Sequence, residues 1–198
     1  MGGTAPPGPW PDMLSSLLIL IYAAGAHAPR PAGLRPEAAE AVLQDISRRG
    51  PEAVLRQVYQ DDRRWQHVLA GIAGGSREWL EVAERLKRVA REPAEELTVA
   101  VARALETEPA HALAILGDAF DADDVCSLNT LEESLGRDYA VALRTVERRR
   151  EAVARVADPA LLKQRDDCLG FLDELRGEVE RNRSSWFGPA FERRTVRH

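Results

Sequence analysis

The sequence of 198 residues is poor in the side chains on which most catalytic and metal sites depend. It has two cysteines and four histidines, and aromatic residues make up 6% of it. It contains no CxxC pair, no phosphate-binding glycine loop, no nucleophile elbow and no H-E-x-x-H motif. These absences argue against the common nucleotide-binding, hydrolase and zinc-enzyme classes. We therefore expect no catalytic residue, no metal site and no cofactor.

Histidine is the usual general base near neutral pH, and its placement here is unpromising. His27 and His198 lie near the two ends of the sequence. His67 and His111 are far apart along the chain, and each stands among apolar residues of an expected helix. We interpret both as packed or surface side chains rather than as catalytic groups.

Lysine is also scarce, and the charge of the chain is acidic overall. Only Lys87 and Lys163 are lysines, so arginine supplies almost all of the positive charge, and the formal net charge is −5. A domain that neutralises nucleic-acid phosphates needs a basic surface. The sequence therefore disfavours nucleic acid as a partner.

The N-terminal region has one uncharged apolar run, residues 14–25. This run is too short for a comfortable membrane span, which takes about 20 residues, but it is typical of the apolar region of a secretory signal. Cleavage after Ala26 fits better than cleavage after Ala28, which would leave Pro29 first. Residues 1–13 lack the usual lysine or arginine, which a start at Met13 would repair. The alternatives are a buried first helix or an uncleaved anchor.

Cys126 and Cys168 are the only cysteines. In an exported chain such a pair predicts a disulfide bond. The alternative is a pair of buried free thiols in a cytosolic protein. The expected localisation is therefore periplasmic or secreted, with the cytoplasm as the alternative.

Composition and periodicity predict an all-α fold. Alanine, leucine, glutamate and arginine, which favour helices, dominate the sequence, and apolar residues recur three and four positions apart. The residues that this spacing predicts to face inward include Val42, Ile46, Tyr59, Leu97, Val101, Ala104, Leu105, Tyr139 and Leu162. We expect about eight short-to-medium helices, stacked as antiparallel hairpins in a HEAT-like array or an irregular bundle. Their expected starts lie at or near Pro36, Pro51, Asp61 or Asp62, Ser76, Pro93, Pro109, Tyr139 and Pro159, with residues 121–137 irregular. The expected organisation is a signal region (1–28), one helical domain (29–180) and a C-terminal tail (181–198).

Three polar groups are weak candidates for a site. Gly74-Gly75-Ser76 precedes a helix and is better explained as a stop and a cap than as an anion site. The acidic cluster of Asp118, Asp121, Asp123 and Asp124 does not fit a calcium loop, and helix capping explains it better. Arg148-Arg149-Arg150, beside Glu147 and Glu151, predicts a solvated, salt-bridged helix face.

The C-terminal tail combines basic and aromatic residues. From residue 181 onward it has five arginines and one glutamate, interleaved with Trp186, Phe187 and Phe191. Such a tail can bind a partner, and we select Trp186, Phe187, Phe191, Arg193 and Arg194 as candidate partner-binding residues. The alternative is a terminus whose aromatic side chains pack back onto the domain.

A set of packing, capping and cysteine positions between residues 65 and 175 is familiar. Its members are Gly75-Ser76, Trp79-Leu80, Glu95-Glu96-Leu97, Ala104-Leu105, Pro109, Val125-Cys126, Asp158-Pro159-Ala160-Leu161 and Cys168-Leu169. In these residues the chain resembles a group of exported, all-helical proteins of Gram-negative bacteria that has no assigned activity. The resemblance implies a helical fold and contributes no catalytic residue.

These observations predict a non-catalytic periplasmic helical protein that binds a protein partner. An immunity or inhibitor protein would be one form of it. The alternatives are an enzyme that acts on the cell envelope through carboxylates not yet identified, and a cytosolic HEAT-like scaffold. We expect no membrane span after signal cleavage, and the oligomeric state is left open.

Overall fold

The computed structural model describes residues 38–127 and 138–187, all of which belong to one compact unit, residues 36–198. Within these two ranges the regular structure is helical, apart from one isolated bridge between Leu116 and Phe120. The all-α prediction is therefore confirmed. The signal region, the helix start at Pro36 and the tail residues Phe191, Arg193 and Arg194 lie outside the described ranges.

Local start and stop signals define the first four helices. Gly50 ends the first helix with φ 83° and Pro51 begins the second, so one residue separates the two. The side chain of Asp61 accepts hydrogen bonds from the backbone of Arg63 and Arg64, and Ser76 caps the fourth helix. The helices are α1 (Ala39–Arg49), α2 (Pro51–Tyr59), α3 (Asp62–Ala73) and α4 (Arg77–Lys87).

The second half of the chain contains two helices that the sequence did not predict. Val125 and Cys126 are buried and form part of a short helix, so the expectation of an irregular segment over residues 121–137 is wrong at its start. Another short helix follows Asn182. The elements are α5 (Ala94–Thr107), α6 (Pro109–Ala114), α7 (Ala122–Cys126), α8 (Tyr139–Ala154), the 3₁₀ helix η2 (Pro159–Leu161), α9 (Leu162–Arg181) and α10 (Arg183–Trp186).

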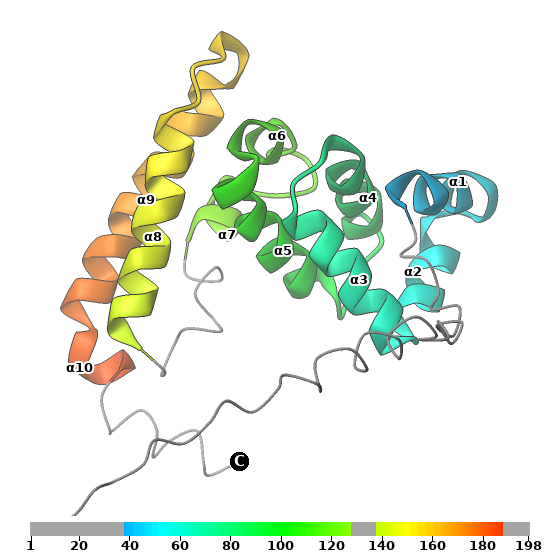
Figure 1. Ribbon diagram of the computed structural model, residues 1–198, viewed down its shortest axis with the longest axis horizontal. Helices are drawn as coiled ribbons and strands as arrows, with labels where there is room; N and C mark the ends of the chain where they lie inside the picture. Colours follow the sequence, from blue (N-terminus) through cyan, green and yellow to red (C-terminus); the bar gives the residue numbers. More distant parts are fainter. Residues whose placement is uncertain (1–37, 128–137, 188–198) are drawn as a thin grey trace, which may run out of the picture. The chain divides into compact units, whose positions relative to one another are not determined.

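Helix α5 contacts α3, α4, α6, α7 and α8. Its buried residues include Leu97, Val101, Ala104 and Leu105, the four that the apolar spacing predicted to face inward. Helices α8 and α9 pack side by side as an antiparallel hairpin (Figure 1). The α8–α9 hairpin thus reaches the first helices of the unit mainly through α5, α6 and α7. No helix in the described ranges is long and apolar enough to cross a membrane.

The inward stripes are confirmed in most helices and wrong at two ends. Val42 and Ile46 of α1 are buried as expected, whereas Tyr59 and Leu162 are 36% and 39% exposed. Both exceptions are terminal residues, the last of α2 and the first of α9. A terminal residue lacks the adjacent turn of its own helix on one side. Its side chain therefore has fewer atoms to pack against.

Two tryptophans fix the packing around α3. Trp65 is buried, and its indole N–H donates a 2.8 Å hydrogen bond to Glu96 of α5. Trp79 of α4 lies against Gly71 of α3 so closely that a Cβ at position 71 would collide with the indole ring. His67 of α3 also contacts the Trp79 ring edge-on, with ring centres 5.6 Å apart.

This packing predicts opposite effects of two glycine-to-alanine substitutions. Gly71→Ala should lower the free energy of unfolding by about 1–3 kcal/mol, because the new methyl group overpacks the Trp79 contact. Gly170→Ala is the matched control, since it lies within α9 with open space around its Cβ position. It should raise stability by up to about 1 kcal/mol through helix propensity. Urea unfolding measures both, and equal effects would contradict this account of the α3–α4 contact.

Candidate functional site

A disulfide joins α7 to α9. Cys126 and Cys168 form the bond, their Cα atoms lie 5.4 Å apart, and both residues are completely buried. The predicted pairing is confirmed. The bond fixes one residue of α7 against α9. Its role is structural, since no solvent reaches either sulfur.

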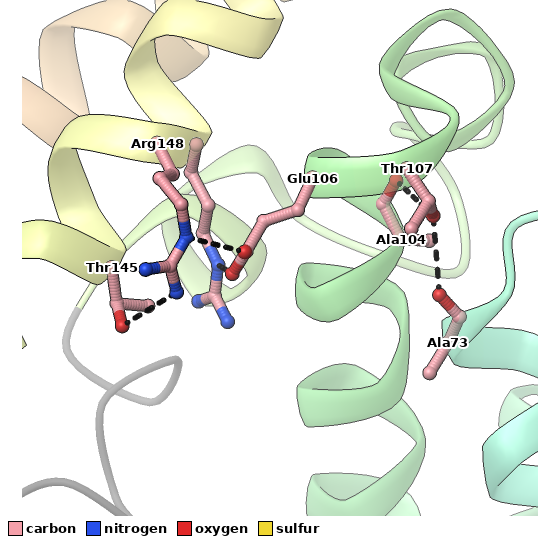
Figure 2. A network of polar contacts seen from close by, with 7 residues as sticks. Ala73, Ala104, Glu106, Thr107, Thr145 and Arg148 are labelled. Carbon is pink, nitrogen blue, oxygen red and sulfur yellow. Dashed lines mark hydrogen bonds and ion pairs between the residues drawn. The ribbon is translucent and has the colours of Figure 1, made fainter. Parts of the chain in front are cut away.

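A second connection between distant parts of the chain is an ion cluster on α5 and α8. Glu106 of α5 accepts a 3.0 Å hydrogen bond from Nε of Arg148 and a 3.1 Å bond from Nε of Arg149. Arg148 also donates to the hydroxyl of Thr145, and Figure 2 shows Glu106 facing Arg148 across the gap between the two helices. Near it, Thr107 hydrogen bonds to the carbonyl groups of Ala73 and Ala104.

The arginine run is only partly the solvated face that the sequence predicted. Arg148 is exposed and Arg150 is half-buried, but Arg149 is 3% exposed. Burial lowers the pKa of the Arg149 guanidinium, and the neighbouring Glu106 carboxylate opposes that shift. The partners across helices are Glu106 and Asp173, rather than the adjacent Glu147 and Glu151. The cluster is therefore part of the core packing between α5 and α8.

Two aspartates of the acidic cluster, Asp121 and Asp124, act electrostatically on Lys87. Its ammonium group donates hydrogen bonds to the carbonyl of Ala94 and, at 2.7 Å, to Thr98, and it lies 5.4 Å from the centre of the Phe120 ring. Desolvation lowers the pKa of Lys87, while Asp124, Asp121 and Glu95 raise it. The carboxylates thus stabilise a half-buried lysine that joins α4 to the start of α5.

The sequence predicted that the acidic cluster caps a helix, and the structure supports only the position of the cap. Asp121 is the N-cap residue of α7, but its side chain accepts no capping hydrogen bond. No group of three or more potential metal ligands occurs within residues 38–127 and 138–187.

His111 lies beside the capped start of α4. Its Nδ1 is 3.1 Å from the carbonyl oxygen of Gly75 and 3.8 Å from the carboxylate of Glu108. Ser76 accepts a hydrogen bond from the backbone of Trp79, as its predicted role as a cap requires. These contacts tie the α3–α4 turn to α6. His67, the other internal histidine, is in the ring contact with Trp79 already described.

The described part of the tail forms a cluster of aromatic residues and arginine at the α10 end of the α8–α9 hairpin. We call Tyr139, Arg183, Trp186 and Phe187 the aromatic–arginine cluster. The Arg183 guanidinium lies 4.5 Å from the centre of the Tyr139 ring, and Phe187 meets Tyr139 edge-on at 5.8 Å. Trp186 and Phe187 are half-buried and pack against the core, as the alternative interpretation of the tail proposed.

A surface hollow adjoins this cluster. It is lined by Tyr139, Glu180, Arg181, Arg183, Ser184 and Phe187. Of the five residues selected from the sequence, the structure brings Trp186 and Phe187 together here. It adds Tyr139 and Arg183, which sequence reasoning had assigned to an apolar stripe and to the general charge of the tail. Their meeting across more than forty residues left no local signal in the sequence.

In comparisons with known proteins, no family model, no curated protein and no solved structure matches this chain.

The disulfide predicts a large loss of stability on its removal. Replacing Cys126 and Cys168 together by serine should lower the free energy of unfolding by about 4 kcal/mol, because the bond closes a loop of 42 residues in the unfolded chain. Urea unfolding of the oxidised protein and the double variant measures the difference. In the native protein the bond should resist a small thiol reductant until urea exposes it. Fast reduction without denaturant would contradict the observed burial.

The ion cluster predicts that Glu106 matters more than a surface glutamate. Glu106→Gln should destabilise the protein by about 2–3 kcal/mol, because it removes the carboxylate charge that is hydrogen bonded to the buried Arg149 guanidinium. Glu151→Gln is the control, since it pairs with Arg155 in an exposed contact and should cost less than about 0.5 kcal/mol. Thermal or urea unfolding of both variants tests the difference, and equal losses would contradict a buried role for Arg149.

Proposed function

We propose that this chain is an exported, non-catalytic helical protein that binds a protein partner through the aromatic–arginine cluster. The observation that carries the proposal is the gathering of Tyr139, Arg183, Trp186 and Phe187 at one surface. Tryptophan, tyrosine and arginine are the side chains that most often dominate binding energy in protein interfaces. A chain with few aromatic residues has concentrated three of them there.

Export is supported by two independent features. The Cys126–Cys168 bond is favoured by an oxidising compartment, because cytosolic thiols are mostly kept reduced. The apolar run at residues 14–25, followed by Ala-x-Ala patterns, has the character of a cleavable signal. A disulfide-bonded helical chain is compatible with a periplasmic or secreted location.

A role without catalysis is supported by how the candidate groups are used. His111 contacts a backbone carbonyl and Glu108, while His67 packs against Trp79. Lys87 is hydrogen bonded to Thr98 of α5, and the charges of Asp121 and Asp124 favour its protonated form. These groups stabilise the fold, which leaves the aromatic–arginine cluster as the strongest candidate for recognition.

Fractionation combined with intact mass tests the export proposal. The full-length chain, expressed in a Gram-negative host, should be recovered from the periplasm. Its mass should correspond to cleavage after Ala26, less the two hydrogen atoms lost when the disulfide forms. A variant with Leu18→Arg and Leu20→Arg in the apolar run is the control and should remain uncleaved in the cytoplasm. A full-length, reduced wild-type chain in the cytoplasm would overturn export.

Site-specific photo-cross-linking in the native bacterium tests the partner proposal. A photoreactive phenylalanine at Ser184, in the hollow beside the cluster, should give one discrete adduct with a second protein. The same residue at Ser47, exposed on α1, is the matched control and should give none. An adduct pattern identical at both positions, or no adduct at position 184, would count against this surface.

A further inference from the structure

The hollow beside the aromatic–arginine cluster has an unusual charge arrangement for this protein. Arg181 and Arg183 both line it, and neither has a carboxylate partner within the described residues. Arginines nearby on the same hairpin are paired: Arg150 with Asp173, and Arg176 with Glu180. The hollow thus combines two positive charges whose hydrogen-bonding capacity is not used by an acidic side chain of the described part of the chain.

Arg183 is held in a position suited to a carboxylate ligand. Its guanidinium carbon lies over the Tyr139 ring, 4.5 Å from the ring centre. A cation over the face of an aromatic ring is attracted by the ring electrons. The guanidinium carries five N–H donors, so those that are not turned toward the ring can bind a carboxylate while the contact with Tyr139 is kept.

Glu180 is the acidic residue among those that line the hollow, and its charge is paired with an arginine other than Arg181 and Arg183. The Glu180 carboxylate lies 3.3 Å from Nε of Arg176, so a third arginine balances it. Ser184 adds an exposed hydroxyl group that can donate or accept. The rings of Tyr139 and Phe187 complete the lining with apolar atoms. Such a lining fits an acidic group that has an apolar neighbour.

We propose that the hollow binds an acidic peptide segment of the protein partner, with a glutamate or aspartate carboxylate on Arg181 and Arg183 and an adjacent apolar side chain on Tyr139 and Phe187. This inference rests on the proposed function and specifies its ligand class. Two arginines that pair with no carboxylate of residues 38–127 and 138–187 complement an acidic partner, and the neighbouring rings complement an apolar residue next to the acidic one.

The same residues fit a peptide better than a lipid surface. Aromatic side chains that anchor a protein to a bilayer have to reach outward into the headgroup region. Here Trp186 and Phe187 are half-buried and pack against the core and each other, with ring centres 6.5 Å apart. The arginines border a concave surface, which receives a side chain more readily than a flat membrane.

Nuclear magnetic resonance of the full chain tests the proposal directly. The probe is a capped hexapeptide that alternates leucine and glutamate, and its control replaces every glutamate by glutamine. The acidic peptide should shift the indole N–H signal of Trp186, assigned by a Trp186→Phe variant, and should bind at least about tenfold more tightly than the glutamine peptide. Equal affinities for the two peptides would overturn the proposal.

Arginine variants locate the binding. Arg181→Gln and Arg183→Gln should each weaken the acidic peptide by about fivefold or more, and Arg183→Lys should not restore affinity because lysine lacks the planar fork. Arg144→Gln is the matched control, as an exposed α8 arginine outside the hollow, and should leave affinity unchanged. An equal loss in all variants would assign the effect to net charge and overturn the site.

Two further arms separate this inference from the proposed function. Vesicles of phosphatidylglycerol that shift the Trp186 signal when the acidic peptide does not would assign the surface to membranes and overturn the peptide proposal. An adduct from position 184 that persists in the Arg181→Gln/Arg183→Gln double variant would support a protein partner at this surface. It would overturn the inference that the partner binds through an acidic segment. Peptide binding that follows the arginines, without any adduct in the cell, would support the ligand chemistry and count against the cellular partner.

Discussion

The arrangement of this molecule depends on a buried charge, the guanidinium of Arg149 between α5 and α8. An ion at 3% exposure is tolerated only with a counter-ion in hydrogen-bonding position, which here is Glu106. That requirement restricts the rotation and the axial position of α8 against α5, because apolar contacts alone allow helices to slide. Since α8 pairs with α9 along the hairpin, the position of α9 follows from the same contact.

The disulfide adds the second restraint on α9 and makes the candidate surface well defined. Cys168 ties α9 to α7, and Arg150 pairs with Asp173, five residues further along α9. These two contacts restrain α9 against α7 and α8. Helix α8 begins at Tyr139, and Trp186 follows the end of α9. A surface that is restrained before binding has a lower entropic cost of association, so these restraints would favour the proposed recognition.

The sequence predicted what local interactions determine. Gly50, Asp61, Ser76 and Asp158 act at helix ends through bonds to residues a few positions away, so their roles could be inferred without a fold. The burial of Arg149 could not be inferred from the sequence, because its partner Glu106 lies on a different helix. An arginine run also usually marks a solvated face. For the site, the tail drew attention to Trp186 and Phe187, whereas Tyr139 and Arg183 joined them only through tertiary packing.

The overall charge of the chain bears on how such a site could select its ligand. At a net charge of −5 the protein repels acidic partners at long range. At physiological ionic strength this repulsion is screened beyond about 8 Å, while contacts made inside a hollow are screened much less. Arg181 and Arg183 line the hollow, so under the proposal an acidic segment would gain most from them when it is seated beside Tyr139 and Phe187. The net negative charge of the chain disfavours acidic polymers, whereas the arginines in the hollow would favour an acidic group that fits inside it. A ligand of matching shape would therefore be preferred over acidic polymers in general.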